Sequence, residues 1–593
     1  MAGFWTRLNF QSVIWKTFLS RSAALSLLAC LALCCPILIG QLCFQSFDAY
    51  AHNDDFLYAR CTQILIDEGR YQHVSQHGQL AASVASHCLW GALVCLPTGF
   101  SYDQLHLAVG LAATLGVVAI YLAARELGGS HRIALLSAMA MLVGPFYYGM
   151  SFTFMTDVTA ASMASIAVFG YARGVVRDSM AWLIVGSIGA SLAMWSRQTH
   201  LCVIAVPTIA LIGDAWHRRR FRRAAFGLLA SCALPLLSFL VFELGWLVPG
   251  DDARVGIVDV ETRDLAWLKQ TIVFVYAGGL LTGLAALPLL PLLVARVCRP
   301  AENVALRKAQ SWATGLVGLL WAGVFAVTGL RTYITQATGY ILYNAHLGPI
   351  LLADQDDPGR WSDIGGVSWP PWIWQIVTAL SIISLALLAG LAATSIGRLI
   401  RRPHESGAVD AVLRRDWFIA GLIGCMLAAS AALLAMVEMV YDRYWMLLYP
   451  MLFPWIGSQR IFPAVPPVRT VRGVTAAVAA MILLMFTMSF VFVHDFLAWN
   501  DARHDQVRVW LDQGLAARDF DAGNGINGWL RSAEDVATHG RPGDDTPFWR
   551  GLAQHALAIG PRPGWEVEKT ISWRSWAAAG KQCTLYVLNK RGP

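Results

Sequence analysis

The chain has 593 residues, of which 56% are hydrophobic and only 14% are charged, and its mean hydropathy is +0.51. A soluble fold could not bury this much apolar surface, so the composition indicates an integral membrane protein. The net charge of +7 comes from short Lys and Arg clusters between apolar runs, which membrane topology explains and which argue against a nucleic-acid partner.

Apolar runs long enough to cross a bilayer recur along the chain, since a helix needs roughly 20 residues to do so. We predict about thirteen spans from this length criterion. The first follows Arg7, Lys16 and Arg21 and is predicted to be an uncleaved signal-anchor whose basic side is cytoplasmic. The predicted spans are 22–41, 103–123, 131–150, 157–174, 180–196, 199–215, 224–247, 268–295, 308–328, 371–396, 417–438, 442–458 and 472–493.

Charge in the connecting loops predicts the orientation of these spans. Basic clusters, above all the one at residues 218–223, fall on one side, which the positive-inside rule makes cytoplasmic. The loops 42–80 and 329–370 and the tail then lie on the other side. The sequence therefore predicts a multi-pass protein of the plasma (inner) membrane, with a cytoplasmic N-terminus and an extracytoplasmic C-terminal region.

Two segments depart from the pattern of spans. Residues 79–97 are apolar but contain Ser83, Ser86 and His87, which favours a helix lying at the outer interface. From Ala498 the composition becomes that of a soluble domain, with apolar residues first at helical and later at strand spacing. We expect an all-α transmembrane domain over 1–496 and a small α/β extracytoplasmic domain over 497–593.

Five ionisable residues meet at the predicted outer membrane boundary, where such groups are costly and indicate function. They are Asp54, Asp55, Asp157, Arg197 and Arg443. Each has a structural alternative that the sequence leaves open. The carboxylates could satisfy N–H groups in the first turn of a helix, and the arginines could be interfacial anchors beside aromatic residues.

The order of these motifs resembles that of the GT-C glycosyltransferases, which are integral membrane enzymes that use polyprenyl-phosphate sugars. Residues 53–71 resemble the family's first outer loop in their acidic pair, in the tyrosine three residues on, and in the glycine that ends the helix. The interfacial helix, Asp157, and Asp442-Arg443-Tyr444 with Pro450 and Pro454 follow in the family's order. Arg197-Gln198-Thr199 is similar to a motif of the eukaryotic glucosyltransferase that completes the lipid-linked oligosaccharide.

The resemblance implies a GT-C-like fold and the inverting transfer of a sugar from a polyprenyl-phosphate donor to a lipid, glycan or protein acceptor. Asp54 is then the expected catalytic base. Asp55, Tyr58 and Asp157 would orient the acceptor or the donor. Four residues, with Arg331 as a weaker candidate, would bind the lipid phosphate, and these are Arg197, Gln198, Arg443 and Tyr444.

We predict no cofactor and no metal, although acidic clusters can bind Mg²⁺. The 12 cysteines form no CxxC pair, so neither a disulfide framework nor a zinc site is indicated. Three other functions remain open from the sequence: an outer-leaflet polysaccharide polymerase or ligase, a secondary transporter, and a non-catalytic membrane scaffold. A transporter would have broken helices in corresponding halves, whereas Pro288 and Pro291 interrupt one span without a symmetric partner.

Overall fold

The structure is a computed structural model, and it describes most of the chain. The described residues are 21–47, 50–52, 54–72, 83–244, 265–298, 303–327, 370–401, 410–436, 441–459, 468–523, 525–530, 553–558, 560–577 and 579–590. The loop 329–370, which we predicted to lie on the outer side, is outside these residues except for its last position, and so is Arg331.

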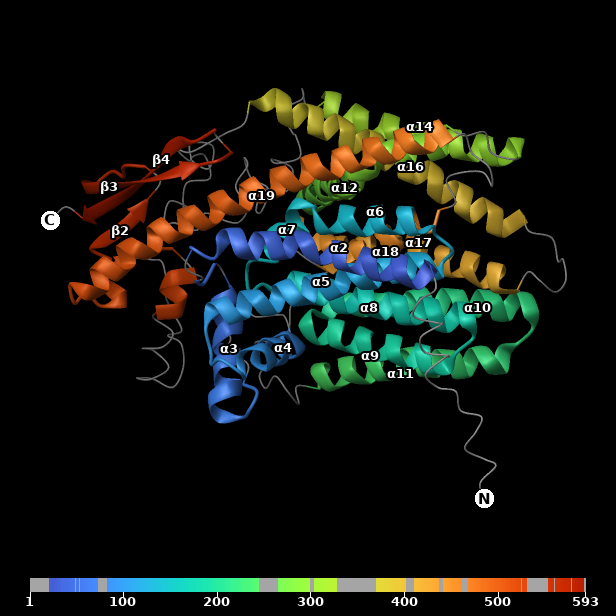
Figure 1. The fold of residues 1–593 in the computed structure, drawn as a ribbon, viewed down its shortest axis with the longest axis horizontal. Coiled ribbons are helices and arrows are strands. Elements are labelled where there is room, and N and C mark those ends of the chain that lie inside the picture. The colour runs from blue at the N-terminus through green and yellow to red at the C-terminus, as the bar shows by residue number, and fades with distance from the viewer. Residues whose placement is uncertain are drawn as a thin grey trace, which may run out of the picture.

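Helices lying roughly side by side make up most of the molecule (Figure 1). The first part contains α2 (Arg21–Phe44), α3 (Asp55–Glu68), α4 (Ala85–Cys95), α5 (Tyr102–Glu126), α6 (His131–Leu142), α7 (Pro145–Met150), α8 (Thr156–Arg177), α9 (Met180–Ser196), η2 (Gln198–Ile204), α10 (Ala205–Arg218) and α11 (Phe221–Glu243). The second part contains α12 (Leu265–Ala286), η5 (Leu287–Leu289), α13 (Leu290–Val297), α14 (Val304–Val327), α16 (Pro371–Arg401), α17 (Asp410–Met436), η9 (Asp442–Leu448), α18 (Tyr449–Gly457) and α19 (Val468–Asp512).

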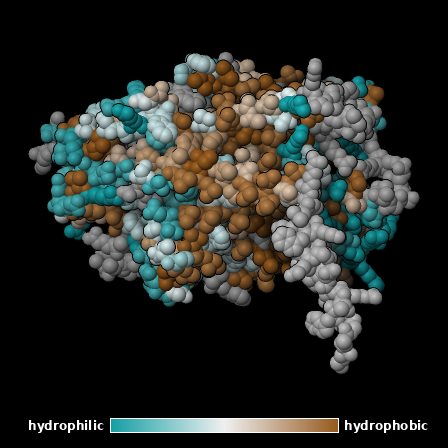
Figure 2. All heavy atoms as spheres, in the orientation of Figure 1, coloured by the Kyte–Doolittle hydropathy of each residue, from teal (hydrophilic) through white to brown (hydrophobic). Residues whose placement is uncertain are grey.

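Each predicted span overlaps a helical segment where the structure describes it, and among the described residues ten helices are long and apolar enough to cross a membrane. Figure 2 shows the corresponding surface, with hydrophobic residues over the middle of the molecule and hydrophilic residues towards its two ends. The predicted all-α polytopic membrane fold is therefore confirmed. The number of helices that actually span the bilayer stays a prediction.

Several predicted spans are interrupted, and proline is the main reason. The run 131–150 divides into α6 and α7 because Pro145 starts a new helix at its first position. The run 268–295 divides at Pro288 and Pro291, which lack the N–H group that a continuous helix needs. Pro450 and Pro454 likewise lie in α18, which follows the 3₁₀ segment η9.

Small residues bring α8 and α9 into close contact. A Cβ atom on Gly170 would lie 2.6 Å from the backbone nitrogen of Gly186, and a Cβ atom on Gly186 would overlap the Tyr171 ring, so this close packing needs glycine at both positions. This packing fixes the positions of both ends of α8, where Asp157 and Asp178 lie.

The C-terminal region contains the expected sheet. Its strands are β1 (Phe520–Asp521), β2 (His555–Ala558), β3 (Trp565–Ser575) and β4 (Lys581–Lys590), in the order β1-β2-β4-β3. The β1–β2 pair is parallel, while β4 runs antiparallel to both β2 and β3. Cys583, Leu585 and Val587 alternate towards the buried face of β4.

One long helix joins the sheet to the bundle. Helix α19 has 45 residues and is therefore about 68 Å long, roughly twice the thickness of the hydrocarbon core. It runs through residue 497, where we expected the second domain to begin, and continues beyond the bundle to the sheet (Figure 1). The Asp495 carboxylate on α19 accepts hydrogen bonds from the backbone N–H groups of Trp576 at 2.7 Å and Ala577 at 3.0 Å.

Residues 525–530 return from the sheet to α3. Arg60 donates a hydrogen bond to the carbonyl of Trp529 at 3.2 Å, and its guanidinium lies 4.1 Å from the centre of the Trp529 ring. Gly528 packs so closely on Phe56 that a Cβ atom would overlap the phenyl ring. The C-terminal region is thus held against the helix that carries the first acidic pair.

Candidate active site

The acidic pair lies at the start of α3. Asp54 occupies the N-cap position, but its side chain makes no capping hydrogen bond. The alternative in which the Asp54 carboxylate serves only to cap the helix therefore does not hold. Its carboxylate is 40% exposed, whereas that of its neighbour Asp55 is fully buried. The two acids consequently have different environments although they are adjacent in the chain.

Asp55 is held by two backbone donors. Its carboxylate accepts hydrogen bonds from the N–H of His52 at 2.7 Å and the N–H of Phe154 at 3.4 Å. Burial raises the pKa of Asp55 to about 7, although both of these bonds lower it. Asp55 thereby joins the loop before α3 to the loop before α8.

This raised pKa predicts how stability depends on pH. The folded state retains the Asp55 proton between about pH 4 and pH 7 while the unfolded state has lost it, so Asp55 makes the protein less stable as the pH rises through that window. Asp55→Asn has no proton to lose. We expect the melting temperature of Asp55→Asn minus that of the native chain to increase from pH 5 to pH 8. An equal difference at both pH values would show that Asp55 does not titrate in this window.

Asp54 faces an arginine from a distant segment. Arg443 lies in η9, is almost completely buried, and approaches the Asp54 carboxylate to 3.6 Å. Partial withdrawal from water raises the pKa of Asp54, and Arg443 acts in the opposite direction by favouring the ionised form. Asp442 accepts a hydrogen bond from the backbone N–H of Arg443 at 2.8 Å, which helps to fix this turn.

A second acid–arginine pair lies beside the first. Asp157 is in the first turn of α8, and its carboxylate forms an ion pair with Arg197, the residue between α9 and η2. The Asp157 side chain is only 3% exposed and that of Arg197 16%. The other oxygen of Asp157 is buried and has no hydrogen-bond partner among the described residues.

Aromatic side chains connect the two pairs. The guanidinium groups of Arg197 and Arg443 lie 4.6 Å and 5.6 Å from the centre of the Tyr444 ring, so one ring contacts both cations. Tyr58, one turn along α3, is also buried. Burial and the nearby Asp54 both raise the pKa of Tyr58, which keeps its hydroxyl protonated as a donor. Gln198 begins η2 directly after Arg197.

The structure thus brings together the site residues that the sequence singled out. Two acid–arginine pairs meet through the contacts of both arginines with Tyr444, at the end of the bundle to which the C-terminal sheet is attached (Figure 1). Such an arrangement can hold an anionic group on its arginines and place a carboxylate beside it. The role of each residue stays a prediction.

Sequence reasoning missed residues that support this site. His87 on α4 lies 3.0 Å from the Thr159 hydroxyl and 3.1 Å from the carbonyl oxygen of Phe154, the residue whose N–H donates to Asp55. Tyr441 lies 5.5 Å from the Arg443 guanidinium. The signal for His87 was present, because a buried histidine interrupts an apolar run, but its partners could not be deduced without the packing.

The fold and the site together define a class: a multi-pass membrane protein with a charged site at one end of its bundle. The family model of dolichyl-phosphate-mannose-protein mannosyltransferase matches residues 89–242 of the chain. The matched part includes Asp157, Arg197 and Gln198. It confirms the predicted relation to the GT-C glycosyltransferases, and no curated protein sequence matches the chain.

Several solved structures resemble this chain at low sequence identity. ArnT from Cupriavidus metallidurans bound to undecaprenyl phosphate matches with 15% identity and a TM-score of 0.41, covering 95% of this chain and 99% of that one. The archaeal oligosaccharyltransferase AglB from Archaeoglobus fulgidus matches with 11% identity and a TM-score of 0.28, covering 69% and 56%. Arabinosyltransferase EmbB from Mycobacterium smegmatis matches with 12% identity and a TM-score of 0.32, covering 80% and 42%.

Proposed function

We propose that this protein transfers a sugar from a polyprenyl-phosphate donor to a lipid, glycan or protein acceptor, with inversion at the anomeric carbon. The observation that carries the proposal is the pairing of Asp54 with Arg443 beside the pair of Asp157 with Arg197. Glycosyl transfer needs one carboxylate as base and cations for the leaving phosphate, and this site contains both.

Asp54 is the proposed base because it is the more accessible of the two adjacent acids. Its carboxylate takes the proton of the acceptor hydroxyl while that oxygen forms a bond to C1 of the sugar. The bond between C1 and the phosphate oxygen breaks, and its electron pair leaves with the polyprenyl phosphate. Attack from the face opposite the phosphate inverts C1. The buried Asp55 positions the Asp54 loop and does not accept this proton.

Arg197 and Arg443 are proposed to hold the phosphate as its charge develops, because guanidinium groups offer forked donors to phosphate oxygens. The Tyr444 ring contacts both guanidinium groups and thereby keeps the two arginines at the same depth in the membrane. Gln198, Tyr58 and Asp157 are proposed to orient the sugar and the acceptor. The two arginines supply the positive charge that the step requires, so we propose no divalent metal.

The proposed orientation places this site at the outer face of the plasma membrane. The cluster at residues 218–223 and Arg414 lies beyond the other end of α8, which is the side that the positive-inside rule makes cytoplasmic. A donor anchored by its lipid tail would then meet a water-soluble acceptor at the boundary where Asp54 lies.

Membrane vesicles test the reaction and its side together. Vesicles carrying the protein should release polyprenyl phosphate from a polyprenyl-phosphate sugar, with or without EDTA, while vesicles lacking it should not. A membrane-impermeant maleimide should label Asp67→Cys, an exposed position on α3, in intact cells. Equal release from both kinds of vesicle would contradict the reaction, and labelling only after lysis would contradict the side. Comparing cell-envelope glycans by mass spectrometry would identify the acceptor.

A further inference from the structure

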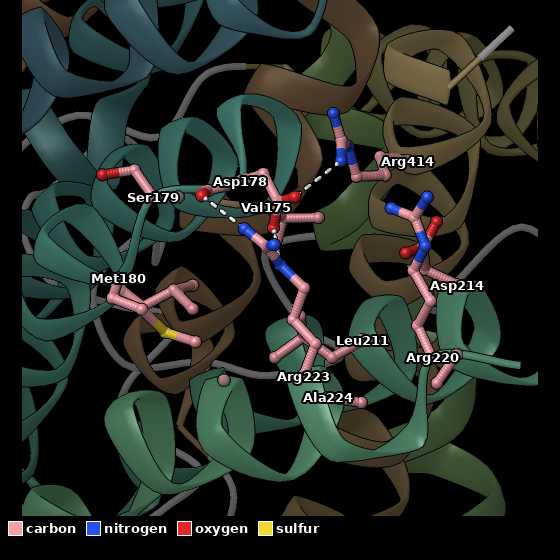
Figure 3. Close-up of a pocket in the computed structure, with 14 residues that line it drawn as sticks. Val175, Asp178, Ser179, Met180, Leu211, Asp214, Arg220, Arg223, Ala224 and Arg414 are labelled. Atoms are coloured by element: carbon pink, nitrogen blue, oxygen red, sulfur yellow. Dashed lines mark hydrogen bonds and ion pairs between the residues drawn. The ribbon is translucent and has the colours of Figure 1, made fainter. Parts of the chain in front are cut away.

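A second charged region lies at the other end of α8 from the candidate active site. Asp178 directly follows α8 and comes 21 residues after Asp157, so the two acids lie about 32 Å apart along the helix. A shallow opening, about 440 Å³ with the adjoining solvent space included, is present there, between the turn that joins α8 to α9 and the start of α11 (Figure 3). The proposed function does not use this opening.

Three arginines and two acids line the opening, and one of the acids, Asp214, is paired at 2.8 Å with Arg218, which lies outside the lining. The Asp178 carboxylate forms ion pairs with the guanidinium groups of Arg223 and Arg414, at N···O distances of 2.6 Å and 3.2 Å, and these pairs fix both guanidinium groups. Arg220 lines the same opening and forms no ion pair with any residue that the structure describes. Figure 3 shows Arg223 and Arg414 approaching Asp178 from two directions, while Arg220 lies apart from them in the same part of the view as Asp214.

Two helices also begin at this opening, and neither is capped by a side chain. Ser179 is the N-cap of α9 and Arg220 that of α11, and neither side chain accepts a capping hydrogen bond. Neither helix has an acidic residue in its first turn, and α11 has Arg222 and Arg223 there. Free N–H groups and the positive end of the helix dipole both favour an anion at such a point.

The surroundings of the opening are apolar on the bundle side. Its walls include Leu183 and Leu211, and the adjoining surfaces of α9 and α11 expose Ile184 at 49%, Phe226 at 65% and Leu229 at 64%. Exposed apolar side chains of this size on spanning helices contact lipid chains. An anion bound in the opening would therefore have room for attached acyl chains along α9 and α11.

We propose that this opening binds the phosphate headgroup of an anionic phospholipid, in the leaflet opposite Asp54. Arg220 would contact the phosphate directly, while Arg223 and Arg414, held by Asp178, would complete the positive wall. Basic pockets between spanning helices on the cytoplasmic side are suited to this kind of headgroup. A free phosphate shares the chemistry of the headgroup but would gain nothing from the apolar surfaces.

Native mass spectrometry of the full chain, titrated with phosphatidylglycerol in detergent, tests the site. Arg220→Ala should weaken the tightest phosphatidylglycerol binding about fivefold, which corresponds to one lost arginine near a phosphate. Arg220→Lys should largely retain binding, because it keeps the charge. The matched control is Arg222→Ala, which removes the same charge from an exposed residue that does not line the opening.

The remaining outcomes decide between the sources of the anion. The proposal is supported if millimolar inorganic phosphate fails to displace the lipid. It is overturned if inorganic phosphate alone binds with the same dependence on Arg220 while phosphatidylglycerol does not. Equal weakening by Arg220→Ala and Arg222→Ala would also overturn it, since that result indicates only general attraction between charges. Melting temperatures of all three variants report whether each is folded.

Discussion

Asp54→Asn should reduce sugar transfer from the polyprenyl-phosphate donor by about 100-fold or more, which is the usual contribution of a general base. Asparagine has nearly the same size and can still accept a hydrogen bond from Arg443, but it cannot take up the acceptor's proton. Because the side chain is 40% exposed, we expect the variant to fold. The measurement is the initial rate of polyprenyl phosphate release in membranes with equal amounts of protein.

Asp67→Asn is the control for this experiment. It makes the same change at an exposed position of the same helix, away from Arg443, and should leave the rate unaltered. The native chain should also lose activity at low pH, with a midpoint above the ordinary pKa of an aspartate, because burial raises the pKa of Asp54. Normal transfer by Asp54→Asn would assign the base to another residue.

Arg197→Ala should destabilise the protein by about 3–5 kcal/mol, because removing one partner of a buried ion pair leaves the other charge buried without compensation. The carboxylate left behind is that of Asp157, which is only 3% exposed. The variant also loses the contact between the guanidinium and Tyr444. Unfolding in detergent, followed by temperature or denaturant, measures the change.

Two further variants separate this effect from a general loss of charge. Asp157→Asn combined with Arg197→Ala should recover part of the lost stability, since no buried charge then remains. Arg177→Ala should cost less than about 1 kcal/mol, because Arg177 is 56% exposed in its pair with Glu126. If Arg197→Ala unfolds no more easily than Arg177→Ala, the pair with Asp157 is not a buried interaction in the membrane.

The class of the protein and the positions of its helices could be read from the sequence, because both depend on local composition. An apolar run of about 20 residues must be helical in a bilayer, whatever it packs against, since its backbone groups have no other partners there. Alternation around Leu585 similarly indicated the last strand. Proline at positions such as Pro145 and Pro288 also acts locally, so the interruptions were visible in the sequence even where the predicted spans ignored them.

The pairing of the site residues was decided only by the tertiary structure. Nothing in the sequence near Asp54 indicates Arg443, and nothing near Asp157 indicates Arg197, because the partners come from separate helices and meet through packing. The role of Asp55 was also decided by the tertiary structure. The sequence left open that its carboxylate caps the helix, whereas in the structure this carboxylate accepts hydrogen bonds from the N–H groups of His52 and Phe154. Residue types and their order are encoded locally, whereas distances between distant segments depend on how α3, α8 and η9 pack together.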